Sequence, residues 1–175
     1  MPAAAPTNQN GAAVAPESRK RRLFWPFVAV CLAGHAWLAV DCANRLAVTH
    51  DEYWHLPVGL LNLETGRFDY DNLNPSLVRV WAALPLASSA ELPALTDEKS
   101  DATKIRDAFL AANAERYDAL FARGRWMIAA LSVATGLMLA LWSRQLFGNA
   151  AACLTVLLWS TSPTALMNAS LVTTD

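Results

Sequence analysis

Charged residues are scarce in this chain of 175 residues. Only 17% of its residues are Asp, Glu, Lys or Arg, whereas about 25% is usual in soluble domains. Hydrophobic residues make up 54% of the chain, and the mean hydropathy is positive. The net charge of -1 by itself says nothing about nucleic acid, but the sequence offers no basic face to wrap phosphates, so we expect no nucleic acid partner. The composition therefore indicates a mostly helical integral membrane protein.

Cysteine is also scarce, and metal-binding motifs are missing. The three cysteines, Cys31, Cys42 and Cys153, are far apart, and two of them lie within apolar segments. Neither a C-x-x-C nor an H-E-x-x-H spacing occurs. The sequence therefore predicts neither a disulfide framework nor a zinc site.

Three apolar segments are long enough to cross a membrane as helices. They cover about residues 23–47, 126–142 and 149–172. Residues 1–22 are small and polar and end in a basic run, which predicts a disordered cytoplasmic N-terminus. The first apolar segment is long for a signal peptide and has no small-x-small cleavage site, so we expect an uncleaved anchor. Ser162-Pro163 predicts a kink in the third segment.

A long segment, residues 49–125, separates the first two spans. It carries twelve acidic and eight basic residues, a balance compatible with the extracytoplasmic side. Thr65-Gly66 predicts the end of a helix over 51–64. Residues 76–88 are apolar but too short to span, and 103–123 have the spacing of an amphipathic helix. We therefore expect an all-α fold with juxtamembrane helices in a long outer loop.

Titratable side chains gather directly after the first span, at His50, Asp51, Glu52 and His55. Ionisable groups at this depth are costly to dehydrate and indicate a functional site. A partly dehydrated carboxylate has a raised pKa and can act as a general base toward a hydroxyl that attacks an anomeric carbon. If the third span runs outward, Asp175 reaches the same face. Asp51, Glu52 and Asp175 are therefore the predicted catalytic acids.

The leaving group of such a reaction in a membrane is a lipid phosphate, which needs positive charge. Arg67 and Arg79 are the nearby candidates, although Arg79 lies in an apolar segment and could instead extend to the interface. The acid and histidine cluster could also bind a divalent metal ion, but its spacing matches no specific motif. A solvated interfacial cluster is the alternative interpretation.

Several short motifs follow one another in a recognisable order. They are Asp51-Glu52-Tyr53-Trp54-His55, Thr65-Gly66-Arg67-Phe68, Asn74-Pro75-Ser76-Leu77, Leu84-Pro85-Leu86, Arg144-Gln145-Leu146-Phe147-Gly148, Ser162-Pro163 and Thr173-Thr174-Asp175. Together they resemble the N-terminal part of the GT-C membrane glycosyltransferases, a group that includes protein O-mannosyltransferases and aminoarabinose transferases. The resemblance covers about residues 23–175. Asn74 and Ser76 stand where that family has a histidine and a second proline.

The resemblance implies an inverting transferase in the inner (plasma) membrane, with its N-terminus in the cytoplasm and its active face outside. It implies a polyprenyl-phosphate-linked sugar as donor and a protein, lipid or glycan as acceptor. Asp51 would be the general base and Asp175 would shape the pocket, with His55 and Asn74 as further substrate-binding residues. We expect the chain to be truncated at residue 175. A non-catalytic scaffold or assembly protein and a transporter-like protein are the alternatives.

Overall fold

The computed structural model describes residues 17–71, 73–90 and 102–173, and every regular element in these ranges is a helix. This confirms the all-α prediction. In chain order the elements are α1 (Glu17–Arg45), α2 (Glu52–Thr65), α3 (Ser76–Ala83), the 3₁₀ helix η1 (Leu84–Leu86), α4 (Ala102–Asn113), the 3₁₀ helix η2 (Ala114–Arg116), α5 (Tyr117–Phe147), α6 (Asn149–Thr161) and α7 (Pro163–Ala169).

Among the described residues, two helices are long and apolar enough to cross a membrane, namely α1 and the helix that contains α5. Helices α6 and α7 are apolar enough to form a third span if they are counted together. They meet at a bend of 61°. The bend falls at the predicted place because Pro163 lacks the N–H that would continue α6. Ser162 caps the new helix by accepting the N–H of Ala165 at 3.4 Å. The protein is therefore an integral membrane protein with two or three apolar spans.

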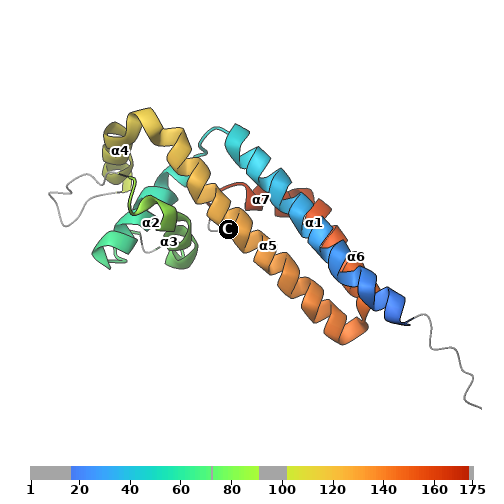
Figure 1. The fold of residues 1–175 in the computed structure, drawn as a ribbon. Coiled ribbons are helices and arrows are strands. Elements are labelled where there is room, and N and C mark those ends of the chain that lie inside the picture. The colour runs from blue at the N-terminus through green and yellow to red at the C-terminus, as the bar shows by residue number, and fades with distance from the viewer. Residues whose placement is uncertain (1–16, 72, 91–101, 174–175) are drawn as a thin grey trace, which may run out of the picture.

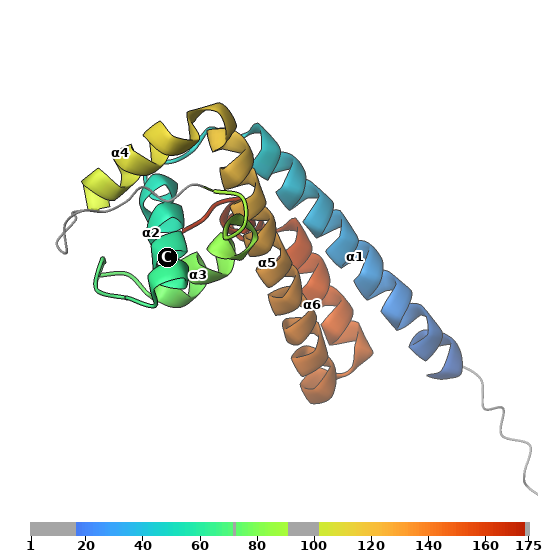
Figure 2. The same ribbon diagram turned by 60° about the vertical axis from the view of Figure 1, so that its left-hand side comes forward.

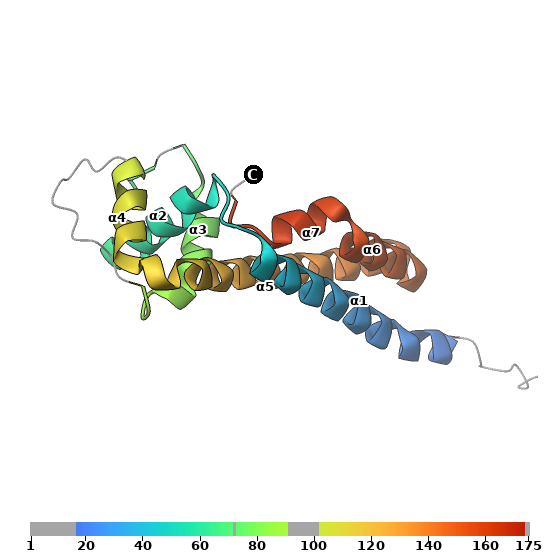
Figure 3. The ribbon, with the colours of Figure 1, turned by 90° about the horizontal axis from the view of Figure 1, so that it is seen from above.

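The three long helices α1, α5 and α6 run side by side as a bundle (Figures 1 and 3). Helices α2, α3 and α4 gather at one end of this bundle, around the beginning of α5 (Figure 2). We call α2, α3, η1 and α4 the cap, and we call the end of the bundle that it occupies the Arg45 end, since α1 finishes there.

Small residues allow the bundle helices to approach closely. A Cβ added at Gly136 of α5 would lie 2.6 Å from Trp159 Cδ1 and 2.9 Å from Leu32 Cδ2. Nearby, α1, α5 and α7 meet through the buried alanines 39, 129 and 169. Gly136 therefore allows α5 to lie close to α1 and α6.

His35 is a polar residue buried within the bundle, and only 1% of its surface is exposed. Its Nδ1 lies 3.3 Å from the Ser160 carbonyl oxygen, and its Nε2 lies 2.9 Å from Ser132 Oγ. Since a carbonyl only accepts, Nδ1 carries the proton and Ser132 donates to Nε2. His35 thus joins α1 to both α5 and α6, just before the break between α6 and α7.

The cap has its own apolar core, shared with α5 and with the segment after α7. Its buried residues are Leu56, Leu60, Ala82, Ala83, Leu86, Phe109, Leu120, Phe121, Ile128 and Val172. Helices α2 and α3 touch at Gly59, where an added Cβ would lie 2.2 Å from the Arg79 carbonyl oxygen. The cap is therefore packed onto the bundle as part of one structure.

Three predicted boundaries need correction. Helix α1 begins at Glu17, so residues 17–22 are helical, whereas its end at Arg45 agrees with the predicted end of the first span near residue 47. The predicted amphipathic helix over 103–123 is two helices, α4 and the beginning of α5, separated by η2. Leu120 and Phe121 pack in the core of the cap, so tertiary contacts extend α5 well beyond the predicted span of 126–142.

Candidate functional site

Asp51 occupies the N-cap position of α2, at the Arg45 end of the bundle. Its backbone carbonyl accepts the N–H groups of Trp54 and His55 at 3.1 and 3.0 Å. Its side chain makes no capping hydrogen bond, and the residue is exposed. The helix start therefore fixes the backbone of Asp51 and leaves its carboxylate accessible.

Glu52, the next residue, is fully buried and paired with Arg125 of α5. The pair is bidentate, with Arg125 Nε 2.7 Å from Oε1 and Arg125 Nη2 2.6 Å from Oε2. The same guanidinium donates to the carbonyl oxygens of Ala43, Leu46 and Ala47 at 2.7, 2.7 and 2.9 Å. These carbonyls belong to the end of α1 and the turn after it, where a helix leaves acceptors without partners. Arg125 therefore joins α1, α2 and α5.

The Glu52 carboxylate accepts further bonds from the Thr49 N–H and Oγ1, both at 3.0 Å, and from the Val172 N–H at 2.9 Å. Burial by itself would raise the pKa of Glu52, but the hydrogen bonds from Arg125, Thr49 and Val172 lower the pKa below its ordinary value. A buried, ionised and fully bonded carboxylate does not fit the catalytic role predicted for Glu52. It fits a structural role instead, in which Glu52 orders the start of α2 for its neighbour Asp51.

The bond from Val172 also places the segment after α7 beside the acidic pair. The third span therefore ends at the same end of the bundle as the first, as the predicted topology requires. Asp175, predicted to complete the acid set, lies outside the described residues.

Aromatic rings and a guanidinium gather on the residues around Asp51 in the chain and on α4. Tyr53 packs against Trp54 with ring centroids 5.3 Å apart and the rings tilted by 44°, and the Tyr53 hydroxyl is hydrogen-bonded to His50 Nδ1. Arg106 of α4 places its guanidinium carbon 5.1 Å from the Tyr53 ring centroid and 5.4 Å from that of Trp54. We call His50, Tyr53, Trp54 and Arg106 the aromatic–arginine cluster. It ties α4 to the first turn of α2.

Arg79, predicted to bind a phosphate, is held in a different network. Its side chain is 1% exposed and donates to Asn62 Oδ1 at 3.0 Å, to Asp71 Oδ2 at 2.6 Å and to the Asp71 carbonyl at 2.9 Å. Burial tends to raise the pKa of Asp71, but bonds from Asn74, the Leu73 N–H and Arg79 lower it overall. Arg79 thus neither extends to an interface nor presents its charge at the surface.

This network also lies away from Asp51. Asn62 follows Asp51 by eleven residues along α2, or about 16 Å at 1.5 Å per residue. Arg67, the other predicted phosphate ligand, is exposed beyond the end of α2, where it pairs with Asp69 at 2.7 Å and lies over the Tyr70 ring at 5.1 Å. The structure therefore does not bring either arginine to the acid cluster.

The two remaining predicted substrate-binding residues occupy separate places. His55 is buried on α2, one turn after Asp51. Asn74 donates to Asp71 Oδ2 at 3.1 Å and so belongs to the Arg79 network. Of the predicted substrate-binding set, only His55 lies close to Asp51 along the chain.

A protein-built metal site has no support in the described ranges. There, no group of three or more His, Cys, Asp or Glu side chains is arranged to hold a metal ion. Asp51 and Glu52 do not act together as ligands, because Glu52 is fully committed to Arg125, Thr49 and Val172.

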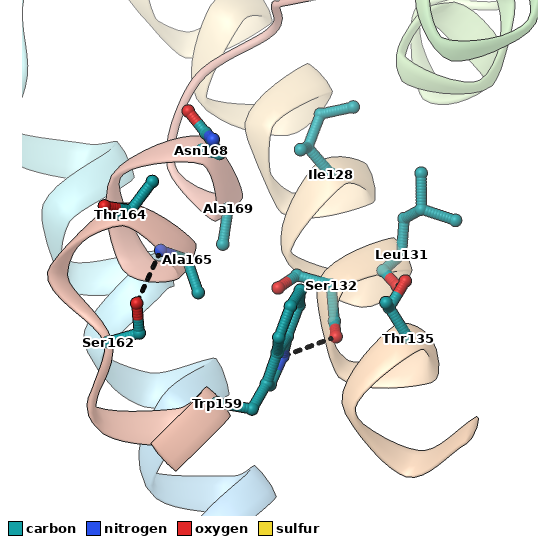
Figure 4. Close-up of a pocket in the computed structure, with 10 residues that line it drawn as sticks. All are labelled: Ile128, Leu131, Ser132, Thr135, Trp159, Ser162, Thr164, Ala165, Asn168 and Ala169. Atoms are coloured by element: carbon teal, nitrogen blue, oxygen red, sulfur yellow. Dashed lines mark hydrogen bonds between the residues drawn. The ribbon is translucent and has the colours of Figure 1, made fainter. Parts of the chain in front are cut away.

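A pocket of about 340 Å³ lies at the break between α6 and α7, and no acidic side chain lines it (Figure 4). Its lining comes from α5, α6 and α7, with Trp159 donating to the Ser132 carbonyl at 3.2 Å across it. The lining residues are Ile128, Leu131, Ser132, Thr135, Trp159, Ser162, Thr164, Ala165, Asn168 and Ala169. Since the lining holds no titratable side chain, we place the candidate chemistry at Asp51.

Two structurally important arginines, Arg125 and Arg106, were not predicted from the sequence, and only the first left a signal. Arg125 stands directly before an apolar span, and a cation there needs a buried partner. The spacing Thr49-x-x-Glu52 is that of a capping box, which predicts that the glutamate turns back onto the chain. Arg106 lies within the predicted amphipathic helix 103–123, and nothing in its spacing indicates the rings on which it packs.

No family model, curated protein or solved structure matches this chain.

Proposed function

We propose that this chain is the N-terminal part of a membrane glycosyltransferase of the GT-C type, with Asp51 as its general base. The observation that carries the proposal is the contrast between two adjacent acids. Glu52 is buried and bonded to three separate elements, whereas Asp51 is exposed on the same helix start. The sequence motifs described above supply the class of reaction.

The orientation follows from the charges at the two ends of the bundle. The basic run Arg19–Arg22 and Arg144 lie at the end opposite the cap. Because basic residues favour the cytoplasmic side, the Arg45 end with Asp51 faces outward. The site is thus on the extracytoplasmic side of the plasma membrane, where a polyprenyl-phosphate-linked sugar is the donor.

In the proposed reaction, a hydroxyl of the acceptor gives its proton to the Asp51 carboxylate. Its oxygen attacks the anomeric carbon of the donor sugar from the face opposite the phosphate. The bond between that carbon and the phosphate oxygen breaks, and its electron pair leaves with the polyprenyl phosphate. The product is therefore inverted at the anomeric carbon. Glu52 takes no proton, and its bonds to Arg125 keep the start of α2 in place.

The test is Asp51→Asn in the longest reading frame that contains this chain. We expect sugar transfer to fall by about 100-fold or more, as for loss of a general base, with unchanged insertion and thermal stability. Glu64→Gln removes an exposed carboxylate from the same helix and should leave transfer unchanged. Wild-type transfer by Asp51→Asn would contradict the assignment of the base.

A further inference from the structure

The aromatic–arginine cluster has features that the proposed chemistry does not yet use. Tyr53 and Trp54 follow Asp51 by two and three residues, in the same first turn of α2. Both rings are half-buried, so part of each ring surface stays open, while His50 is exposed. The rings are held in place by Arg106, which itself pairs with Asp107 at 2.6 Å.

The position of the cluster indicates which substrate it would contact. A general base must lie within hydrogen-bonding distance of the acceptor hydroxyl. Trp54 follows Asp51 by three residues, and side chains at this spacing lie on the same face of a helix. The leaving phosphate departs from the opposite face of the sugar. The cluster thus belongs to the acceptor side of the proposed reaction.

The chemistry of the cluster matches a saccharide. One face of a pyranose ring carries mainly C–H groups, which pack against aromatic surface, and its rim carries hydroxyls that bond to carboxylates, imidazoles and guanidinium groups. Here two ordered rings lie beside the His50 imidazole and the Arg106 guanidinium, which pairs with the Asp107 carboxylate. An extended peptide offers no flat face of this kind.

We propose that Tyr53, Trp54 and Arg106 bind a saccharide, and that this saccharide supplies the acceptor hydroxyl. This inference rests on the proposed function, because the bound saccharide is an acceptor only if the protein transfers a sugar. Trp54 provides the stacking surface, and Arg106 holds the two rings in place across α2 and α4. The saccharide binds without the donor, so binding can be measured separately from transfer.

The experiment is saturation-transfer NMR on the purified chain in zwitterionic lipid nanodiscs, with the methyl glycosides of mannose, galactose and arabinose as probes. We expect at least one probe to bind, and Trp54→Ala to weaken its binding by about tenfold or more, equivalent to about 1.4 kcal/mol. Trp54→Phe keeps a ring and should restore part of the affinity. Arg106→Lys keeps the charge but loses the planar stacking group, so it should also weaken binding.

Two control variants match these changes. Trp126 lies at the same end of the bundle, is 46% exposed and donates to Asn44, so Trp126→Ala should not alter binding. Arg45 is an exposed arginine paired with Asp41 but stacked on no described ring, so Arg45→Lys should also bind normally. Equal losses for Trp54→Ala and Trp126→Ala, or no binding of any probe, would overturn the proposal.

Asp51→Asn separates this inference from the proposed function. This variant should bind the glycoside but transfer no sugar. If the wild-type protein transfers no sugar but binds the glycoside in a way that depends on Trp54, the proposed enzymatic function is wrong and the saccharide site is supported. Transfer to a serine-containing peptide without glycoside binding would support the enzyme and overturn the saccharide site.

Discussion

Arg125 makes more structural contacts than its place at the start of an apolar segment suggests. It donates two hydrogen bonds to Glu52 and three to carbonyls at the end of α1. A cation at this depth has few alternatives, because lipid cannot replace those acceptors. The residue therefore fixes the start of α2, and with it Asp51.

Removing Arg125 should destabilise the protein strongly. Arg125→Ala leaves the buried Glu52 charge without its cation, and breaking such a pair costs about 3–5 kcal/mol. Thermal unfolding in detergent should show a large fall in melting temperature, while Arg45→Ala, which breaks an exposed pair, should leave it unchanged. A small effect of Arg125→Ala would mean that Glu52 and Arg125 do not hold the helices together.

The lowered pKa values of Glu52 and Asp71 predict how stability depends on pH. Because the folded state holds these carboxylates ionised below the ordinary pKa of about 4, it binds fewer protons there than the unfolded state. Their stabilisation is complete at neutral pH and is lost as the pH falls through the lowered folded-state pKa values. Melting temperatures measured from pH 7 to 3 should decline in the acid range, and less steeply for Glu52→Gln. If the melting temperatures of the wild type and of Glu52→Gln fall equally with pH, the lowered pKa of Glu52 does not contribute to stability.

At the scale of elements, the contact between α2 and α3 depends on a missing side chain. Gly59 faces the Arg79 backbone so closely that an added Cβ would lie 2.2 Å from its carbonyl oxygen. Backbone cannot move aside as a flexible side chain can. The same contact holds Arg79 next to Asn62 and Asp71.

Gly59→Ala should therefore separate α2 from α3. We expect a loss of about 1–3 kcal/mol, as for an overpacked core, measured by thermal or denaturant unfolding. Gly34→Ala in α1 is the matched control, since nothing lies within 4 Å of its added Cβ. That change should be neutral or stabilise the helix slightly. Equal destabilisation by both substitutions would show that the contact does not matter.

The break between α6 and α7 shows how an element can be predicted while its role cannot. Ser162-Pro163 indicates the break from sequence alone. Only the folded chain shows that the segment after α7 then reaches Glu52 and donates the Val172 N–H to it.

For the whole molecule, the proposed orientation makes a direct prediction. In a variant with Cys31, Cys42 and Cys153 replaced by alanine, Glu64→Cys places a thiol on the cap and Gln145→Cys places one at the opposite end of the bundle. A membrane-impermeant maleimide should label residue 64 in intact cells. It should label residue 145 only after permeabilisation. The reverse pattern would place Asp51 in the cytoplasm and remove the proposed site from the outer face.

The sequence by itself determined the helical class, the membrane spans, the bend at Pro163 and the helix end at Gly66. These features depend on local properties, namely the length of apolar runs and the backbone preferences of proline and glycine. The sequence also located the acid pair after the first span.

Only the tertiary structure decided what each charged residue does. Arg79 and Arg67 have the same chemistry as Arg125 and Arg106, yet the first two lie away from Asp51 while Arg125 binds Glu52 and Arg106 orders the rings beside the acid. A charge takes its partner from whichever element packs against it, over separations such as the 73 residues between Glu52 and Arg125. Local sequence patterns do not indicate such distant pairings. The different roles of Asp51 and Glu52 could therefore be recognised only from the folded structure.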